Sequence, residues 1–215
     1  GEIYNYRELR RELQGEGFTF QTSGDTEVIL AAWARWGTAC LDRLDGMFAF
    51  VLYDIAKGQV LLARDRLGVK PLYYAALADG SLAFASEMKG LLAHPLLERR
   101  VSRAGVDAFL TWGYVPDSHA ILEGAYKLPA APFWLFALGK GRGQPQRWWD
   151  IDFTQRTKAS EAELSEELLR LLRAGVASRM VADVPLGAFL SGGVDSSSVV
   201  ALMSETSNAP VQTCS

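Results

Sequence analysis

The amino-acid sequence predicts an α/β protein with two domains, an α+β sandwich of antiparallel sheets followed by the start of a parallel-sheet α/β domain. Between residues 47 and 86, short aromatic and β-branched runs alternate with glycine-containing turns, which predicts an antiparallel meander. The first run is apolar on both faces, so we expect this sheet to be covered on both sides. After residue 158 the pattern becomes helix, strand, glycine-rich loop, helix, strand, which is typical of a βαβ unit.

Helices are predicted around this meander. Leu9 and Leu13 lie four residues apart within residues 4–13, and glycines follow them, which predicts a short amphipathic helix. A second helix is expected to start at residues 24–26 and to end at Gly37. Two further N-caps are expected at Ser86, for a helix over 87–92, and at Ser102, for a helix over 106–110.

The second domain is predicted from a capping box. Ser160 and Glu163 are spaced as such a box, and the leucines that follow form the apolar stripe of a helix ending near Met180. We expect the domains to cover residues 1–147 and 158–215. In the second domain the expected elements are a strand over 186–190, a helix over 196–203 and a strand over 211–214.

Composition excludes several classes of partner. The 215 residues include 22 basic and 25 acidic side chains, and they are interleaved without a basic stripe, so nucleic acid is not expected as a partner. No apolar run approaches the roughly 20 residues that span a bilayer, so no membrane partner is expected. The two cysteines, Cys40 and Cys214, have no metal-ligand spacing, which favours a reducing cytoplasm over a disulfide framework.

A glycine-rich loop over residues 191–197 has the form SGGxDS and lies between a predicted strand and a predicted helix. Free N–H groups and the helix dipole favour an anion at such a place, and two glycines let the backbone approach it. The loop lacks the lysine of a Walker-type loop, so transfer of a terminal phosphoryl group is disfavoured. The alternative is a glycine-rich turn in which serine is an ordinary helix cap.

This loop resembles the pyrophosphatase loop of the N-type ATP pyrophosphatases, which cleave ATP between the α- and β-phosphates. The resemblance implies ATP as a ligand, with Leu190 offering main-chain contacts to adenosine. An acid beside an anion is repulsive unless a cation lies between them, so Asp195 is expected to bind Mg²⁺. The implied ATP and pyrophosphate ligands are Leu190, Ser191, Gly192, Gly193, Asp195 and Ser196.

Six segments together resemble the glutamine-hydrolysing asparagine synthetases, in this order: GEIYNYRELR, SGDTEVILA, LDRLDGMFAFVLYD, ARDRLGVKPLYY, FASEMKGLL and LSGGVDSSSVVAL. The resemblance implies a class II glutaminase of the N-terminal-nucleophile fold, in which a cysteine at the mature N-terminus attacks glutamine. That cysteine is absent here, and Cys40 has no free α-amine to replace it. We therefore expect an internal fragment that alone neither hydrolyses glutamine nor makes asparagine.

The same resemblance assigns three residues to the glutaminase site. Gly1 is expected to supply an oxyanion-hole N–H, and Glu2 and Asp25 to bind the α-ammonium group of glutamine. From the residues alone, Glu2 also fits a solvated surface acid and Asp25 a helix cap. The segment Arg64-Asp65-Arg66 is expected to form a surface ion cluster or a domain contact.

The implied activity is asparagine synthesis, in which ammonia from glutamine attacks a carboxylate activated by ATP and releases AMP and pyrophosphate. Aspartate is the expected acceptor, and a homodimer is compatible with it. Two alternatives remain: an amidotransferase or β-lactam-synthetase-like relative with another acceptor, and a non-catalytic module that keeps the fold. Where relatives read Pro-Pro-Gly-His, this chain reads Pro-Ala-Ala-Pro at residues 129–132, which puts the local geometry and the acceptor-side contacts in doubt.

Overall fold

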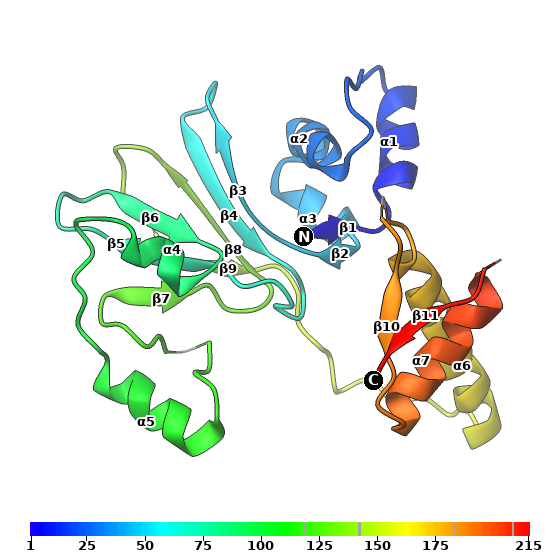
Figure 1. Cartoon of the computed structure of the whole chain (residues 1–215). Coiled ribbons are helices and arrows are strands. Elements are labelled where there is room, and N and C mark those ends of the chain that lie inside the picture. The colour runs from blue at the N-terminus through cyan, green and yellow to red at the C-terminus, as the bar shows by residue number, and fades with distance from the viewer. Residues whose placement is uncertain (118, 142, 183, 208) are drawn as a thin grey trace. The chain divides into compact units, whose positions relative to one another are not determined.

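The computed structural model describes residues 1–117, 119–141, 143–182, 184–207 and 209–215. They form two compact units, unit 1 (Gly1–Ile151) and unit 2 (Asp152–Ser215), shown in Figure 1. The functional limits 1–147 and 158–215 stay a prediction. Within the described ranges, no helix is both long enough and apolar enough to cross a membrane.

Helices open unit 1, as predicted. The first starts two residues later than expected, and the second ends at Gly37, which is the C-cap with φ +57°. A short antiparallel pair lies between the chain start and the end of this helical region. The elements are β1 (Glu2–Ile3), α1 (Tyr6–Gly15), α2 (Asp25–Trp36), η1 (Gly37–Ala39), α3 (Cys40–Arg43) and β2 (Gly46–Met47).

Two antiparallel sheets form the centre of unit 1, with strand orders β3-β4-β8-β9 and β6-β5-β7. The single meander predicted for residues 47–86 is therefore wrong. Strands β3 and β4 pair with each other, as do β5 and β6, but β4 and β5 belong to different sheets. The strands are β3 (Ala49–Asp54), β4 (Gln59–Arg64), β5 (Tyr73–Ala76), β6 (Leu82–Ala85), β7 (Ala125–Lys127), β8 (Pro132–Ala137) and β9 (Gln146–Arg147).

The chain passes between the sheets twice, and the two crossings are hydrogen-bonded to each other. Residues 65–72 lead from β4 to β5, and residues 128–131 lead from β7 to β8. The N–H of Leu128 donates to the carbonyl of Leu72 at 2.8 Å, and the N–H of Ala131 donates to the carbonyl of Asp65 at 3.1 Å. Each bond continues the ladder of one sheet, the first beyond β5 and β7 and the second beyond β4 and β8, so both sheets stay paired up to the point where the chain crosses.

The alternation of side chains builds a layered sandwich. Leu61 and Ala63 of β4 lie in a core with α1 and α2, whereas Leu62 lies between the sheets with Leu128 and Trp134. Beyond the second sheet a third core includes Leu91 of α4 (Met88–Leu92). The order is helices, sheet, sheet, helix, and Figure 1 shows α2 and α4 beside different sheets. The prediction of an α/β sandwich covered on both sides is confirmed.

The two predicted serine caps have different outcomes. Ser102 caps α5 (Arg103–Trp112), because its Oγ accepts from the N–H of Gly105 at 3.1 Å. Ser86 does not cap α4, whose N-cap is Glu87 without a side-chain bond. The helix begins one residue later than expected, so the serine hydroxyl is outside the capping position.

Unit 2 has the predicted βαβ order. The capping box is present, since Ser160 Oγ accepts from the N–H of Glu163 and the glutamate side chain accepts from the N–H of Ser160. The two strands pair in parallel, which confirms the expected parallel sheet. The elements are α6 (Glu161–Arg179), β10 (Gly187–Phe189), α7 (Val194–Thr206) and β11 (Gln212–Cys214).

Candidate functional site

The chain start and the start of α2 are joined by one hydrogen bond. The N–H of Ile3 donates to Asp25 Oδ2 at 2.9 Å. Gly1 and Glu2 directly precede Ile3 and are exposed, whereas Asp25 is half-buried. The structure therefore brings the first residues of the chain, which include Gly1 and Glu2, next to Asp25.

Close backbone approach fixes this strand in place. A Cβ on Gly1 would lie 2.6 Å from the carbonyl oxygen of Met47, and a Cβ on Gly46 would lie 2.1 Å from the carbonyl oxygen of Glu2. Real Cβ atoms do not approach so closely, so both positions require glycine. The position of Gly1 is thus set by its contact with the chain at residues 46–48.

Asp25 does not act as a helix cap. The N-cap of α2 is Gly24, and no side chain caps the helix. Asp25 is the first helical residue, and its Oδ2 reaches back to Ile3 while Thr26 Oγ1 lies 3.4 Å from its Oδ1. The capping alternative for Asp25 is therefore wrong, and one carboxylate oxygen remains for a ligand, apart from the long contact with Thr26.

The predicted surface ion cluster is also wrong for two of its three residues. Arg64 is 5% exposed and Asp65 is 2% exposed. The Asp65 carboxylate accepts from backbone N–H groups of four residues, and a buried carboxylate is tolerated where such donors surround it. The four donors are Phe48 at 3.2 Å, Leu67 at 3.2 Å, Val69 at 2.9 Å and Lys70 at 3.0 Å.

The two arginines beside Asp65 also bind the backbone. The Arg64 guanidinium donates to the carbonyl of Lys70 at 2.7 Å and to Asp117 Oδ2 at 2.7 Å. Arg66 donates to the carbonyls of Leu44 at 2.7 Å and Asp42 at 2.9 Å. These side chains hold the segments that flank β2 and the crossing over residues 65–72, so their contacts are structural.

Cys40 cannot act as a nucleophile in this fold. Its side chain is fully buried in the helical core. Burial, with a smaller contribution from the negative charge of Asp42, raises the pKa of the Cys40 thiol to about 12. The reactive form of cysteine is the thiolate, so this thiol is inert at neutral pH.

The predicted phosphate loop lies between β10 and α7. Gly192 adopts φ +79°, and a Cβ there would meet no atom within 4 Å. The hydroxyls of Ser191 and Ser196 lie 3.1 Å apart, and the Ser196 hydroxyl also donates to the carbonyl of Gly193 at 3.2 Å. The N–H of Leu190 donates to the carbonyl of Cys214 at 2.8 Å, and the Leu190 carbonyl accepts from no backbone N–H of the part of the chain that the structure describes.

Free N–H groups gather where α7 begins. The first backbone bond of the helix runs from the N–H of Ser197 to the carbonyl of Gly193 at 3.1 Å. Within the described residues, the N–H groups of Val194, Asp195 and Ser196 have no acceptor, as at any helix N-terminus. The N-cap of α7 is Gly193 and no side chain caps it, so serine is not an ordinary cap here.

The loop fits a polyphosphate better than it fits a metal ion alone. No group of three or more histidine, cysteine or acidic side chains gathers within the described ranges. Asp195 is exposed in the first turn of α7, where it offers a single carboxylate. Mg²⁺ is commonly bound by one or two carboxylates together with substrate phosphates, so Asp195 fits a shared ion and not a protein-only site.

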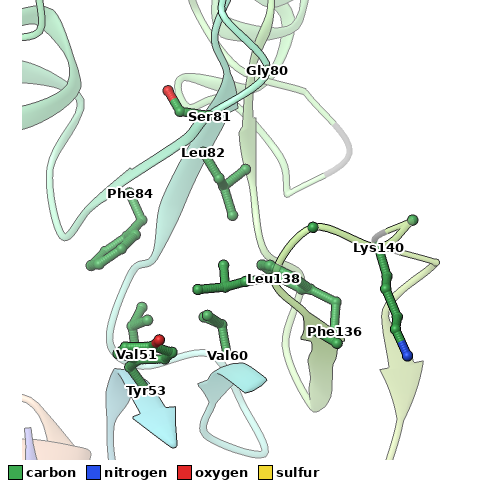
Figure 2. A pocket seen from close by; sticks show the side chains of 13 residues that line it. Val51, Tyr53, Val60, Gly80, Ser81, Leu82, Phe84, Phe136, Leu138 and Lys140 are labelled. Atoms are coloured by element: carbon green, nitrogen blue, oxygen red, sulfur yellow. The ribbon is translucent and has the colours of Figure 1, made fainter. Parts of the chain in front are cut away.

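An apolar groove of about 800 Å³ lies elsewhere in unit 1, between the edges of the two sheets. Figure 2 shows Leu82 and Phe84 of β6 across from Val51, Tyr53 and Val60 of the first sheet. None of the predicted site residues lines this groove. Its lining is mostly apolar, and Lys140 at the rim is its charged residue among those that the structure describes, so the groove offers no carboxylate for the ammonium group of an amino acid.

Comparison with known proteins follows the division into two units. The glutamine amidotransferase domain model matches residues 1–149, and the asparagine synthase model matches residues 167–215. Asparagine synthetase 3 of Bacillus subtilis is 35% identical over 204 residues, covering 94% of this chain and 32% of the relative. Asparagine synthetase B of Escherichia coli is 37% identical over 203 residues, covering 94% and 31%. Amidase chry2 of Gibberella zeae is 34% identical over 207 residues, covering 95% and 30%.

Among solved structures, the glutamine PRPP amidotransferase of B. subtilis, complexed with ADP and GMP, is 17% identical with a TM-score of 0.47 and covers 99% of this chain and 44% of that chain. The chain spans about a third of the length of the curated relatives named above. The chain belongs to the glutamine amidotransferase family through residues 1–149 and carries part of an asparagine synthase domain in residues 167–215.

Proposed function

We propose that the whole protein containing this chain is a glutamine-hydrolysing asparagine synthase, a carbon–nitrogen ligase that uses ATP and Mg²⁺. The observation that carries the proposal is the start of α7, where free N–H groups and the hydroxyls of Ser191 and Ser196 converge on one exposed bend. That bend lies in the same chain as a glutamine amidotransferase domain. Glutamine and aspartate are the proposed substrates, and the proposal includes a cytoplasmic homodimer.

In the glutaminase half, the proposed roles follow from charge and position. The Gly1 N–H is suited to bind the oxyanion of the tetrahedral intermediate, and one such donor typically contributes about 3 kcal/mol. Asp25 Oδ1 and the Glu2 carboxylate supply negative charge for the substrate's α-ammonium. Two carboxylates on one cation select free glutamine over a glutamine within a peptide, whose nitrogen is uncharged.

In the ATP half, the loop binds the diphosphate that leaves. The N–H groups at the start of α7 and the two serine hydroxyls donate to its oxygens, and Gly192 and Gly193 let the backbone come close. Asp195 would hold Mg²⁺ against the same oxygens, where the ion offsets the growing negative charge. The acceptor carboxylate forms an acyl-adenylate because AMP is a far better leaving group than a carboxylate oxygen. Ammonia then displaces AMP.

A different acceptor is the second candidate, favoured by one observation. One relative at 34% identity is named an amidase, not a synthetase. The second candidate keeps glutamine hydrolysis in the first domain and ATP cleavage in the second. It differs only in which carboxylate the protein activates.

ATP–pyrophosphate exchange in the full-length protein tests the proposal across candidate acids. We expect exchange that depends on aspartate, and amide formation with either glutamine or added ammonia. Exchange with another acid but not with aspartate would replace asparagine synthesis by the second candidate. A full-length protein without exchange and without glutaminase activity would be a non-catalytic module.

A further inference from the structure

The segment that leads into α2 has no regular secondary structure between residues 18 and 24, yet it ends at Asp25. Arg10 of α1 reaches across to this segment. Its Nη1 donates to the carbonyl of Thr22 and its Nη2 donates to the carbonyl of Gly24 at 2.8 Å. Its guanidinium carbon lies 4.7 Å from the ring centre of Phe20, so the same group also stacks on the segment.

Glu27 holds the same segment from the side of α2. Its carboxylate accepts from the N–H of Gln21 at 2.8 Å and from both the N–H and the hydroxyl of Thr22 at 2.8 Å. The bonds from Gln21 and Thr22 hold the pKa of Glu27 below its usual range. Within the described residues, no ion pair joins Glu27 to Arg10. Each of the two side chains instead binds backbone groups of residues 21–24.

We propose that Arg10 and Glu27 are positioning residues that set Asp25 for recognition of the α-ammonium group of an amino-acid substrate, an inference that rests on the proposed function. Thr22 is held on its carbonyl by one residue and on its N–H and hydroxyl by the other. Gly24, held by Arg10, is the N-cap from which Asp25 follows. The two side chains therefore fix the point at which α2 begins.

The consequence for Asp25 is geometric. Its Oδ2 accepts from the N–H of Ile3 at 2.9 Å, which sets the rotation of the carboxylate, and its Oδ1 makes the long 3.4 Å contact with Thr26 Oγ1. A charge-assisted hydrogen bond loses most of its strength when its donor and acceptor move apart by about 1 Å. Loosening the segment is therefore expected to weaken substrate binding without changing the chemical step.

Arginine is required for this role. The guanidinium binds two carbonyls two residues apart and stacks on an aromatic ring, which needs a planar fork that lysine lacks. The Arg10 Nε is buried and has no acceptor within the described residues. The side chain thus keeps its place although one donor is unsatisfied, which indicates that the contacts to Thr22 and Gly24 dominate.

The test uses Arg10→Met, Arg10→Lys and Glu27→Gln in the full-length protein. We expect the KM for glutamine to rise about tenfold or more in each, with kcat and the ammonia-dependent rate nearly unchanged. Arg11→Met is the matched control, because Arg11 is the next residue of the same helix and, among the described residues, contacts the carbonyl of Arg7 and the carboxylate of Glu8 on an exposed face. A change of kcat with constant KM, or an equal effect of Arg11→Met, would overturn the proposal.

A double-mutant cycle adds a readout that a general loss of stability does not move. Asp25→Asn alone should raise the KM for glutamine, and adding Arg10→Met should raise it little further, because both act through one contact. Full additivity of the two effects would contradict the proposed coupling.

Amide hydrogen exchange of Ile3 in the full-length protein separates this inference from the proposed function. Exchange of that amide should accelerate in Arg10→Met and Glu27→Gln but not in Arg11→Met. A wild-type protein without glutamine-dependent activity, combined with accelerated exchange, would overturn the proposed substrate while keeping the positioning of Asp25. Unchanged exchange in both variants would overturn the positioning itself.

Discussion

Unit 1 and unit 2 differ in what holds their candidate sites in place. Unit 1 buries three clusters of apolar side chains, and the residues proposed for its glutamine site come from two separate segments of the chain. In unit 2 the described residues bury only Leu202 and Met203 among the apolar side chains, and its candidate loop is one continuous stretch. The first site therefore depends on packing and strand pairing at a distance, whereas the second depends on the local backbone at a helix start.

The largest effect is expected from a substitution that removes long-range contacts in unit 1. Asp65→Ala leaves four backbone donors without their acceptor in a buried place, so we expect unit 1 to lose about 4 kcal/mol of unfolding free energy. Urea unfolding followed by tryptophan fluorescence measures this, because all six tryptophans lie in unit 1. Asp107→Ala, on an exposed face of α5, is the control and should change stability by less than about 0.5 kcal/mol. A loss for Asp65→Ala as small as that of the control would show that water satisfies the four donors.

The second prediction concerns the local support in unit 2. Gly192→Ala places a side chain at φ +79°, which costs about 1 to 2 kcal/mol although no atom is near. Gly193→Ala, at φ −76°, avoids that cost. We expect the affinity of the full-length protein for pyrophosphate, measured by calorimetry, to fall about tenfold in Gly192→Ala and less in Gly193→Ala. The reverse order would mean that crowding of the ligand, not backbone conformation, limits the loop.

A smaller effect tests the departure from the family pattern at residues 129–132. Ala131 adopts φ +67°, which is unusual for a residue other than glycine, and it is buried. Ala131→Gly removes that strain but also a buried methyl group, so we expect stability to stay within about 1 kcal/mol of wild type. Ala63→Gly, in the second half of β4, removes a buried methyl without relieving strain and should cost more, about 1 to 2 kcal/mol. Equal losses in the two variants would show that the Ala131 backbone is unstrained.

The smallest effect is a pH dependence in residues 18–24 of unit 1, the segment that leads into α2. The pKa of Glu27 is lowered in the folded state by its bonds to Gln21 and Thr22. A lowered pKa means that the stabilisation is fully present above the unfolded value of about 4.3 and is lost as the pH falls through the folded value. Exchange of the Gln21 and Thr22 amides should therefore accelerate in acid in the wild type and stay independent of pH in Glu27→Gln, after correction for intrinsic rates. If the exchange rates of these amides in the wild type were as independent of pH as in Glu27→Gln, other contacts would be holding the amides.

Much of the fold follows from local chemistry that a sequence displays. The stop at Gly37, the cap at Ser102 and the box of Ser160 with Glu163 each depend on one backbone conformation or one short-range bond, and all three are confirmed. The assignment of strands to sheets was not predictable in the same way. A run of alternating residues reports which faces are apolar, but it does not report which strand lies alongside.

The sequence allowed the candidate site residues to be proposed, but it did not show which buried or distant side chains hold the candidate sites in place. The glycine-rich loop was found because its residues are contiguous. Arg64 and Asp65 were expected on the surface because charged side chains seldom lie inside, and their backbone partners come from several separate segments. One signal was available, since an aspartate before a Leu-Gly turn can accept from the next N–H groups, as it does here from Leu67 and Val69. Arg10 and Glu27 gave no such signal, because on a helix they look like ordinary solvated charges.

The paired crossings between the sheets have a consequence for motion. The bond from Leu128 to Leu72 continues the ladder of β5 with β7, and the bond from Ala131 to Asp65 continues the ladder of β4 with β8. Arg64 ties the two crossings together, because its guanidinium donates to the carbonyls of Lys70 and Leu128. Movement of one crossing relative to the other would break these buried contacts, whereas residues 18–24 are held by exposed side chains and not by a sheet, so we expect any adjustment to a ligand to occur in residues 18–24.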